Sequence, residues 1–414
     1  MKIKTVILLA VISIFACGLL VSLCSCSGND EKGTDDDSAG DDDSSPADDD
    51  SAVNPFLAPE KRGPYLVGNT SYFFEDDSRE LGCDPGGNRV LLTEVWYPAD
   101  DSAAALPENM IDDFFLGRTD EVKAALEAAG YTDEDPINLP TGSYRDAPLR
   151  PNTPLMPLLF FSHGFSSNRF QNYTMAAYLA SHGYIVIAPD HACNSIATLT
   201  PDDVVILNVL YTVKALPDRK ADLIFLIDIF TENPPEMFAG RLDAAHIGLF
   251  GHSFGGITVS ETIKIEPRAS AMIQLAAFGF PPVPAEVKAP SMYFSGREDK
   301  VMHPYEFLHN AYIEQMPPPK LQLEFFDTGH FTFSDLCRFV PRLMASGNGC
   351  GTETRIGSDE LFTNPSVDSL HEVMDPYSTA FFGSVFFQYE ELISFLAINH
   401  NATMMDYIIV PVPN

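Results

Sequence analysis

The chain has 414 residues, 45% of them hydrophobic and 20% charged, so it is long enough to bury a large core. Its formal net charge of -33 at pH 7 argues against a nucleic-acid partner, because an excess of carboxylates repels phosphate.

The first 26 residues are predicted to export and anchor the protein. Two lysines precede a continuous apolar run that ends at Leu23, which is the arrangement of a secretory signal. The segment Leu23-Cys24-Ser25-Cys26 resembles a bacterial lipobox, in which Cys26 is lipidated and becomes the mature N-terminus. Cys24 fits this role less well, because a bulky leucine precedes it. We therefore expect a membrane-anchored lipoprotein of the cell envelope, on the periplasmic face or the cell surface. An uncleaved transmembrane anchor is the main alternative, because the apolar run is nearly long enough to span a bilayer, and free secretion is the third.

Residues 27–54 are predicted to form a disordered linker. Triplets of aspartate alternate there with serine, alanine and glycine, so the segment has little apolar surface to bury. Repulsion between the carboxylates keeps such a chain extended. The folded domain is then expected to comprise residues 55–414.

Four cysteines lie outside the signal region, and an even number in an exported chain indicates disulfide bonds. Cys337 and Cys350 flank a short loop and are the best candidate pair. Cys83 and Cys193 are then paired by elimination. The spacing is not that of a zinc site, and we expect neither a metal nor a cofactor.

The predicted elements, in chain order, indicate an α/β domain. A strand rich in β-branched and aromatic residues starts at Arg89, and residues 120–130 have helical spacing. Short continuous apolar runs follow, at residues 157–164, 184–191, 246–253, 271–278, 291–296 and 321–330. Helical patterns separate or follow them, at residues 169–183, 218–231 and 254–265, and one long C-terminal helix is predicted at 375–400. Such alternation predicts a mostly parallel sheet, buried on both faces and flanked by helices.

The stretch GLFGHSFGG, residues 248–256, contains the motif G-x-S-x-G between a predicted strand and a predicted helix. This is the nucleophile elbow, a sharp turn that raises the serine hydroxyl above the carboxyl ends of the strands. Gly251 and Gly255 remove side chains that would clash in so tight a turn. Ser253 is therefore the candidate nucleophile.

A serine hydroxyl needs a base to take its proton, and the base is expected in a loop after a later strand. His330 follows the last predicted strand and is the candidate base. His252 lies within the elbow and is expected to point elsewhere. His303 and His309 fall in a predicted helix, where surface or packing roles are the more ordinary explanation.

The base needs a carboxylate to orient it. Asp299 follows the predicted strand at 291–296 and is the candidate acid. Glu298 is adjacent but is expected to face solvent. Asp327, three residues before His330, is the second alternative.

Two backbone amides are expected to form the oxyanion hole. One is the N–H of Phe254, directly after the nucleophile. The other is the N–H of Phe165, in the loop FSHGFSS, where Gly164 allows the backbone to turn. His163 is expected to support this loop rather than to take part in chemistry.

The motifs FSHGF, GHSFGG and TGH, with the earlier segments GPYLVG, EVWYPA and SYRDAPL and the helical DRKADLIFLID, resemble one branch of the α/β-hydrolases. The branch is that of platelet-activating-factor acetylhydrolase and the bacterial dienelactone-hydrolase-like esterases. The resemblance covers residues 60–400 and implies hydrolysis of esters, often of short acyl chains, without a cofactor. Two features depart from it. Dienelactone hydrolases use a cysteine nucleophile, where this chain has Ser253. The acetylhydrolases carry their acid one strand earlier, at a position that matches Ala276, which leaves Asp299 as the acid here.

These observations predict that residues 55–414 form the catalytic domain of a serine carboxylic-ester hydrolase that acts on short-chain or small esters through an acyl-enzyme. A phospholipase of the acetylhydrolase kind and a polyester-degrading hydrolase are the alternatives among enzymes. A catalytically silent surface lipoprotein is the alternative outside them. The expected partners are an ester substrate and a membrane, and the sequence does not indicate an oligomeric state.

Overall fold

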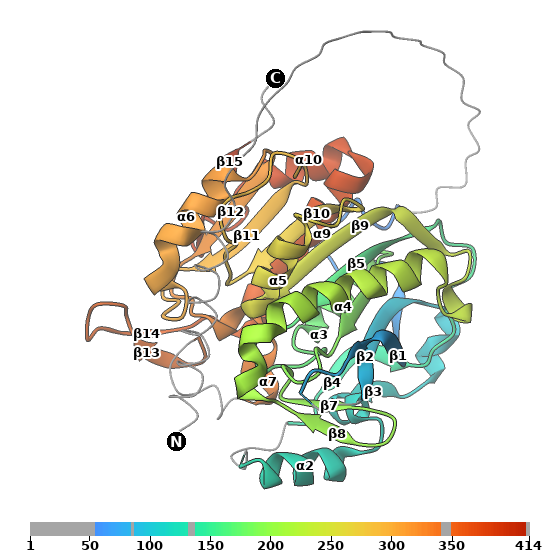
Figure 1. Ribbon diagram of the computed structural model, residues 1–414. Coiled ribbons are helices and arrows are strands. Elements are labelled where there is room, and N and C mark those ends of the chain that lie inside the picture. Colours follow the sequence, from blue (N-terminus) through green and yellow to red (C-terminus); the bar gives the residue numbers. More distant parts are fainter. Residues whose placement is uncertain (1–53, 84–86, 131–136, 341–348, 411–414) are drawn as a thin grey trace, which may run out of the picture.

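The computed structural model describes residues 54–83, 87–130, 137–340 and 349–410 (Figure 1). The predicted signal peptide, its lipidation site Cys26 and all but the last residue of the predicted linker lie outside these ranges. Among the described residues, none of the helices is both long enough and apolar enough to cross a bilayer.

A large sheet forms the centre of the described chain, with the strand order β15-β12-β11-β10-β9-β5-β6-β2-β1-β4-β3. Its middle strands all run parallel: β5 (Met156–Ser162), β6 (Ile185–Pro189), β9 (Leu242–His252), β10 (Ala269–Leu275), β11 (Ser291–Gly296) and β12 (Lys320–Phe325). Each corresponds to one of the six predicted apolar runs. Every residue of β5 and β6 is buried, as expected for strands covered on both faces.

Other strands extend the sheet at both edges: β1 (Leu66–Glu80), β2 (Asn88–Ala99), β3 (Glu108–Met110), β4 (Pro140–Arg145) and β15 (Met405–Val410). β2 pairs antiparallel with β6, β1 pairs antiparallel with β2, and β15 pairs antiparallel with β12. The predicted strand at Arg89 is β2. β1 was not predicted, because polar and charged residues interrupt its apolar positions.

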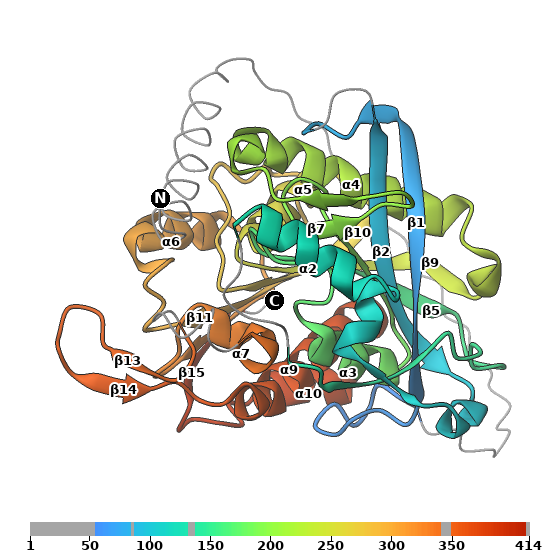
Figure 2. The ribbon, with the colours of Figure 1, turned by 90° about the horizontal axis from the view of Figure 1, so that it is seen from below.

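Helices cover both faces of the sheet (Figure 2). One face carries α4 (Thr212–Glu232), α5 (Phe254–Thr262) and α6 (Glu306–Gln315), and their apolar side chains pack into one core. The opposite face carries α3 (Tyr173–Ser181), α9 (Val367–Phe387) and α10 (Glu390–Leu396), which pack into a second core. The predicted α/β fold with a mostly parallel sheet between helices is therefore confirmed.

The predicted C-terminal helix at 375–400 is wrong in its bounds. The first helix, α9, already begins at Val367, where the Ser366 side chain accepts a hydrogen bond from the Ser369 amide. It ends at Phe387, followed by Gln388, whose φ of 55° is left-handed, and α10 comes next. The apolar spacing continues across this break, so the sequence pattern does not reveal it.

The smaller elements lie beyond the layers: α2 (Thr119–Ala128), α7 (Leu336–Phe339), and the hairpins β7 (Ala197–Leu199) with β8 (Val204–Ile206) and β13 (Thr352–Thr354) with β14 (Leu361–Thr363). Disulfide bonds join Cys83 to Cys193 and Cys337 to Cys350, as predicted. The second bond ties α7 to the segment that leads into β13.

Candidate active site

The loops that carry the candidate residues all leave the same edge of the sheet. Phe165 follows β5, Ser253 follows β9, Asp299 follows β11 and His330 follows β12. Because these strands are parallel and adjacent or nearly so, their carboxyl ends bring residues far apart in the sequence to one place.

Ser253 has the strained backbone that a nucleophile elbow requires. Its φ of 54° and ψ of -122° lie outside the usual regions for a non-glycine residue, at a cost of about 1–3 kcal/mol. A Cβ on Gly251 would lie 2.5 Å from the Gly255 carbonyl carbon, and a Cβ on Gly255 would lie 1.8 Å from the Ser162 oxygen. Only glycine fits at both positions, which explains the motif on either side of the serine.

Ser253, His330 and Asp299 form a continuous hydrogen-bonded chain. The Ser253 Oγ lies 2.8 Å from His330 Nε2, and His330 Nδ1 lies 2.8 Å from Asp299 Oδ2. Asp299 Oδ1 accepts hydrogen bonds of 2.9 Å from the amides of Val301 and Met302, which fix the carboxylate. His330 and Asp299 are buried, whereas Ser253 is partly exposed. A neutral His330 in this arrangement donates its Nδ1 proton to Asp299 and is able to accept the serine proton at Nε2.

The two alternative carboxylates are engaged elsewhere. Glu298 does not face solvent as expected, because its side chain accepts hydrogen bonds from Arg355 and from the Ile356 amide. Asp327 is exposed and lies 2.6 Å from the same arginine. Asp299 is therefore the carboxylate that the structure brings to the imidazole.

The loop expected to supply one oxyanion donor lies directly against the nucleophile. A Cβ on Gly164 would be 3.5 Å from the Ser253 Cβ. Phe254 begins α5, so its amide is one of the N–H groups that a helix leaves free at its start. Within the described ranges, the amides of Phe165 and Phe254 donate to no other protein group.

One buried connection joins three of these loops and was not predicted. The Gly164 amide donates to Gln171 Oε1 at 2.7 Å, and Gln171 Nε2 lies 2.6 Å from His252 Nδ1. His252 Nε2 in turn lies 2.9 Å from the His330 carbonyl oxygen. His252 thus points away from the serine hydroxyl, as expected, but it holds the backbone of the candidate base. Burial, together with the nearby His330, lowers the pKa of His252 to about 3, so the ring is neutral and able to accept from Gln171. Sequence spacing gives no signal for this contact, because Gln171 and His252 are 81 residues apart.

A buried charged group lies below the candidate oxyanion loop. The Arg219 guanidinium donates to the His163 carbonyl and sits 4.7 Å from the centre of the Phe254 ring. Burial lowers the pKa of Arg219 to about 9. Burial alone would raise the pKa of Asp222, but the charge of Arg89 and a hydrogen bond from His191 bring it below its ordinary value.

His163 is a structural member of this group. Its Nδ1 lies 2.7 Å from the Gly164 oxygen, and its Nε2 lies 2.9 Å from Ser195 Oγ. Burial and the charge of Arg219 keep its pKa well below the ordinary value, so it is neutral. The geometry fits the expected supporting role.

Apolar side chains lie on both loops that adjoin the nucleophile. Phe165 and Phe254 belong to one contact cluster that also contains Ile257, Phe278, Phe280, Met302, Tyr305 and Leu308. Phe165 is only partly buried, and because it follows Gly164, which packs against Ser253, it presents apolar surface beside the nucleophile.

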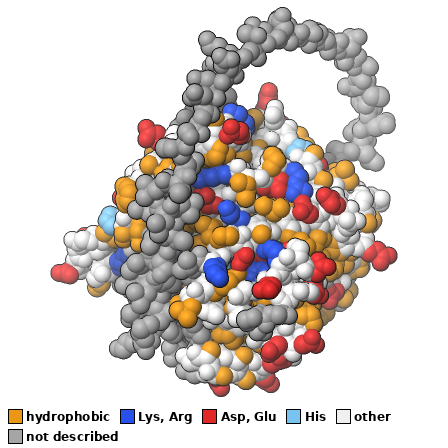
Figure 3. Space-filling model, in the orientation of Figure 1, with side chains coloured by type: hydrophobic (Ala, Val, Ile, Leu, Met, Phe, Trp, Pro, Cys, Tyr) orange, Lys and Arg blue, Asp and Glu red, His pale blue; other side chains and the backbone are white. Residues whose placement is uncertain are grey.

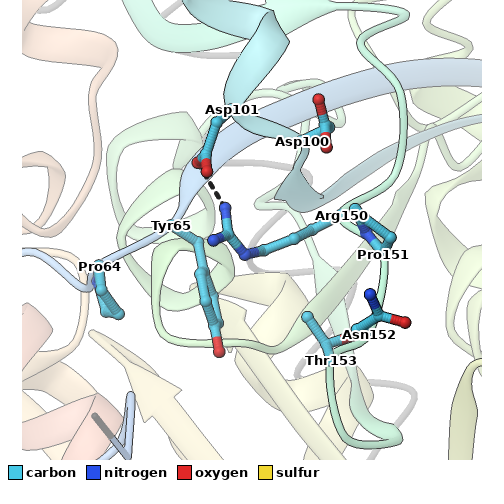
Figure 4. A pocket seen from close by; sticks show the side chains of 8 residues that line it. All are labelled: Pro64, Tyr65, Asp100, Asp101, Arg150, Pro151, Asn152 and Thr153. Atoms are coloured by element: carbon cyan, nitrogen blue, oxygen red, sulfur yellow. Dashed lines mark hydrogen bonds and ion pairs between the residues drawn. The ribbon is translucent and has the colours of Figure 1, made fainter. Parts of the chain in front are cut away.

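A separate shallow hollow of about 480 Å³ lies away from these residues (Figure 4). Tyr65 and Arg150 line it, and the Arg150 guanidinium is 4.9 Å from the Tyr65 ring centre and forms an ion pair with Asp101. β2 runs antiparallel to β6 and ends at Ala99, so this hollow lies at the amino ends of the parallel strands. It is thus at the sheet edge opposite to the serine. No cluster of His, Cys, Asp and Glu side chains suited to a metal ion occurs in the described ranges.

Comparison with solved structures identifies the fold. The chain superposes on the ferulic acid esterase from Streptomyces cinnamoneus with a TM-score of 0.62, covering 84% of this chain and 97% of the esterase, at 23% sequence identity. The fold is that of the α/β-hydrolases.

Within that class, the chain is similar to platelet-activating factor acetylhydrolases. Residues 52–204 match the family model for platelet-activating factor acetylhydrolase, isoform II. The platelet-activating factor acetylhydrolase of the guinea pig, Cavia porcellus, is 26% identical over an alignment that covers 65% of this chain. That alignment spans 64% of the guinea pig protein.

Proposed function

We propose that this protein is a serine carboxylic-ester hydrolase. The observation that carries the proposal is the chain of 2.8 Å contacts from Ser253 through His330 to Asp299, at the carboxyl edge of a parallel sheet. The similarity to two kinds of ester hydrolase supports it.

The proposed reaction follows from the proton positions in the hydrogen bonds between Ser253, His330 and Asp299. Ser253 Oγ attacks the ester carbonyl while its proton moves to His330 Nε2, and Asp299 stabilises the imidazolium. The amides of Phe165 and Phe254 donate to the carbonyl oxygen as it becomes negative. His330 then gives the proton to the leaving alkoxide, and an alcohol departs from the acyl-enzyme. Water, deprotonated by His330, attacks the acyl carbonyl; the acid leaves and Ser253 regains its proton.

The apolar cluster that contains Phe165 and Phe254 favours a small apolar acyl or alcohol group in the substrate. Its phenylalanines, with Met302 and Tyr305, offer contact area but few fixed hydrogen-bond donors. Short-chain and small esters are therefore the proposed substrates.

An acetylated phospholipid of the platelet-activating-factor kind is the second candidate substrate. It is favoured by the family match over residues 52–204 and by the guinea pig relative. The position at which that branch is expected to carry its acid is Ala276, which directly follows β10, has a φ of 46° and carries no carboxylate. Asp299 is therefore the proposed carboxylate of the triad, whichever of the two substrates is hydrolysed.

The membrane tether belongs to the proposal as well. A lipid on Cys26 and an acidic spacer, as the sequence predicts, would hold residues 55–414 at the cell envelope. Metabolic labelling with a fatty acid that is lost in Cys26→Ser would support this arrangement, and unchanged labelling would contradict it.

A panel of p-nitrophenyl esters with acyl chains of increasing length tests the activity, with an acetylated phospholipid beside it. We expect the full chain to turn over the shortest esters fastest and to react once per molecule with a fluorophosphonate. A protein that is folded but inert to both the esters and the fluorophosphonate would refute the proposed hydrolase.

A further inference from the structure

The loops that carry the candidate acid and base are held from outside by one hairpin. The acid loop comprises residues 297–300 and the base loop residues 327–332. The hairpin β13–β14, with its flanking residues 349–364, lies beside both loops and protrudes from the body of the protein (Figure 1).

Glu353 is the centre of this contact. It lies on β13, is 6% exposed, and uses both carboxylate oxygens. Its Oε2 lies 2.7 Å from Lys300 Nζ, in the acid loop next to Asp299. Its Oε1 accepts hydrogen bonds of 2.7 Å from the Gly349 amide and from Asn364 Nδ2. One buried carboxylate thus contacts the acid loop directly and the base loop through two neighbours.

Those neighbours touch the backbone on both sides of His330. Asn364 Oδ1 accepts from the Gly329 amide at 2.8 Å and from the Thr332 hydroxyl at 3.3 Å. Thr332 Oγ1 also donates to the Gly349 oxygen at 2.7 Å. A Cβ on Gly349 would lie 2.9 Å from the His330 nitrogen, so this segment packs directly against the peptide of the candidate base.

A second side chain of the same hairpin repeats the bridge. Arg355 directly follows β13, two residues after Glu353. Its Nη1 lies 3.0 Å from Glu298 Oε1 in the acid loop and 2.6 Å from Asp327 Oδ1 in the base loop.

We propose that Glu353 is a positioning residue, which through Lys300 and Asn364 sets the separation of Asp299 and His330. The inference rests on the proposed hydrolase, because it concerns the geometry of that triad. Glu353 touches no reacting atom. Without it, Lys300 loses its partner, and the Gly349 amide and Asn364 lose their shared acceptor, so among the described residues Arg355 is the one hairpin side chain that still bridges the two loops. Displacement of a catalytic group by even 1 Å costs about 100-fold in rate.

The test compares Glu353→Gln with Asp359→Asn in the full chain. Both changes remove one negative charge from the same hairpin, but Asp359 is exposed at its far end. Active sites are counted with a fluorophosphonate, so that kcat is expressed per reactive serine. We expect kcat of Glu353→Gln on p-nitrophenyl acetate to fall 10- to 100-fold with KM little changed, and Asp359→Asn to behave as the wild type. A purely structural role would lower the number of active sites and the melting temperature but leave kcat per site unchanged.

A second measurement does not depend on turnover. Hydrogen–deuterium exchange should rise in both the acid loop and the base loop of Glu353→Gln, and in neither loop of Asp359→Asn. Lys300→Met removes the same ion pair from the other side and should reproduce the loss of kcat if Glu353→Gln fails to fold. A kcat per site within about twofold of the wild type in the folded variants would overturn the proposal. Unchanged hydrogen–deuterium exchange in both loops of Glu353→Gln would also overturn the positioning role. This outcome can be read even if the wild type hydrolyses no ester, so it separates failure of this proposal from failure of the proposed function.

Discussion

His252 Nε2 lies 2.9 Å from the carbonyl oxygen of His330, so the residue before the nucleophile holds the backbone of the candidate base. Through Gln171 the same imidazole reaches the amide of Gly164, next to the expected oxyanion donor Phe165. Three of the four loops of the candidate site are thereby linked by buried hydrogen bonds between neutral groups.

Gln171→Leu tests this link. The change leaves the Gly164 amide and the acceptor nitrogen of His252 without their buried partner, which costs about 1–3 kcal/mol for each unsatisfied group. We expect a lower free energy of unfolding in urea and a fall in kcat that exceeds any change in KM. Gln322→Leu, at a partly buried glutamine on β12, is the matched control. Equal effects of the two substitutions on kcat would show that the link does not position the site.

Ser253→Ala tests the nucleophile. Removal of the hydroxyl leaves no group to form the acyl-enzyme, so kcat on short p-nitrophenyl esters should fall by about 10⁴-fold or more. The circular dichroism spectrum should match that of the wild type, because alanine fills the same partly exposed space. Turnover of Ser253→Ala near the wild-type rate would mean that another residue is the nucleophile.

Asp299→Asn and Asp327→Asn separate the two acidic candidates. An amide at position 299 no longer stabilises the His330 imidazolium and favours the wrong tautomer, which should lower kcat by about 10³- to 10⁴-fold. The exposed Asp327 binds Arg355 rather than the imidazole, so its substitution should cost far less. The reverse order of the two rate losses would assign the acid to Asp327.

The buried histidines make stability depend on pH in a definite direction. Burial, with the charge of Arg219, lowers the pKa of His191 to about 3, so the folded protein holds this ring neutral. The unfolded chain takes up the proton near pH 6.5, and the stabilising contribution of His191 is therefore present above that pH and is lost on acidification towards pH 3. The stability difference between wild type and His191→Asn should be about 1–2 kcal/mol smaller at pH 5 than at pH 7.

Urea unfolding at several pH values measures this difference. A difference for His191→Asn that grows on acidification would mean that His191 is charged in the folded protein.

The parts of the molecule that the sequence predicts well are those with a local pattern. The apolar runs become the buried parallel strands, and G-x-S-x-G between a strand and a helix identifies Ser253 because the strained turn needs glycine on both sides. His330 and Asp299 follow from the order of strands in this fold, since each comes directly after a strand that ends at the same edge.

The remaining features arise from contacts between distant segments. Glu298, next to Asp299, was expected to face solvent, but it is buried and accepts a hydrogen bond from Arg355, 57 residues away in the hairpin. Glu353 and Asn364 lie in a polar stretch with no periodic pattern, and only the folded loops give them partners. The break at Gln388 is likewise invisible, because apolar residues continue on both sides of it.

The bond between Cys337 and Cys350 ties α7, which follows the base loop, to the segment that leads into Glu353. The cytosol of an ordinary bacterial expression host keeps thiols reduced. Protein prepared there should retain its strands and the turn at Ser253, but it would lack the disulfide that ties α7, next to the base loop, to the hairpin. Low activity in such a preparation would therefore result from the reduced cysteines and not from the lack of a catalytic group. Refolding in an oxidising glutathione buffer should restore the activity.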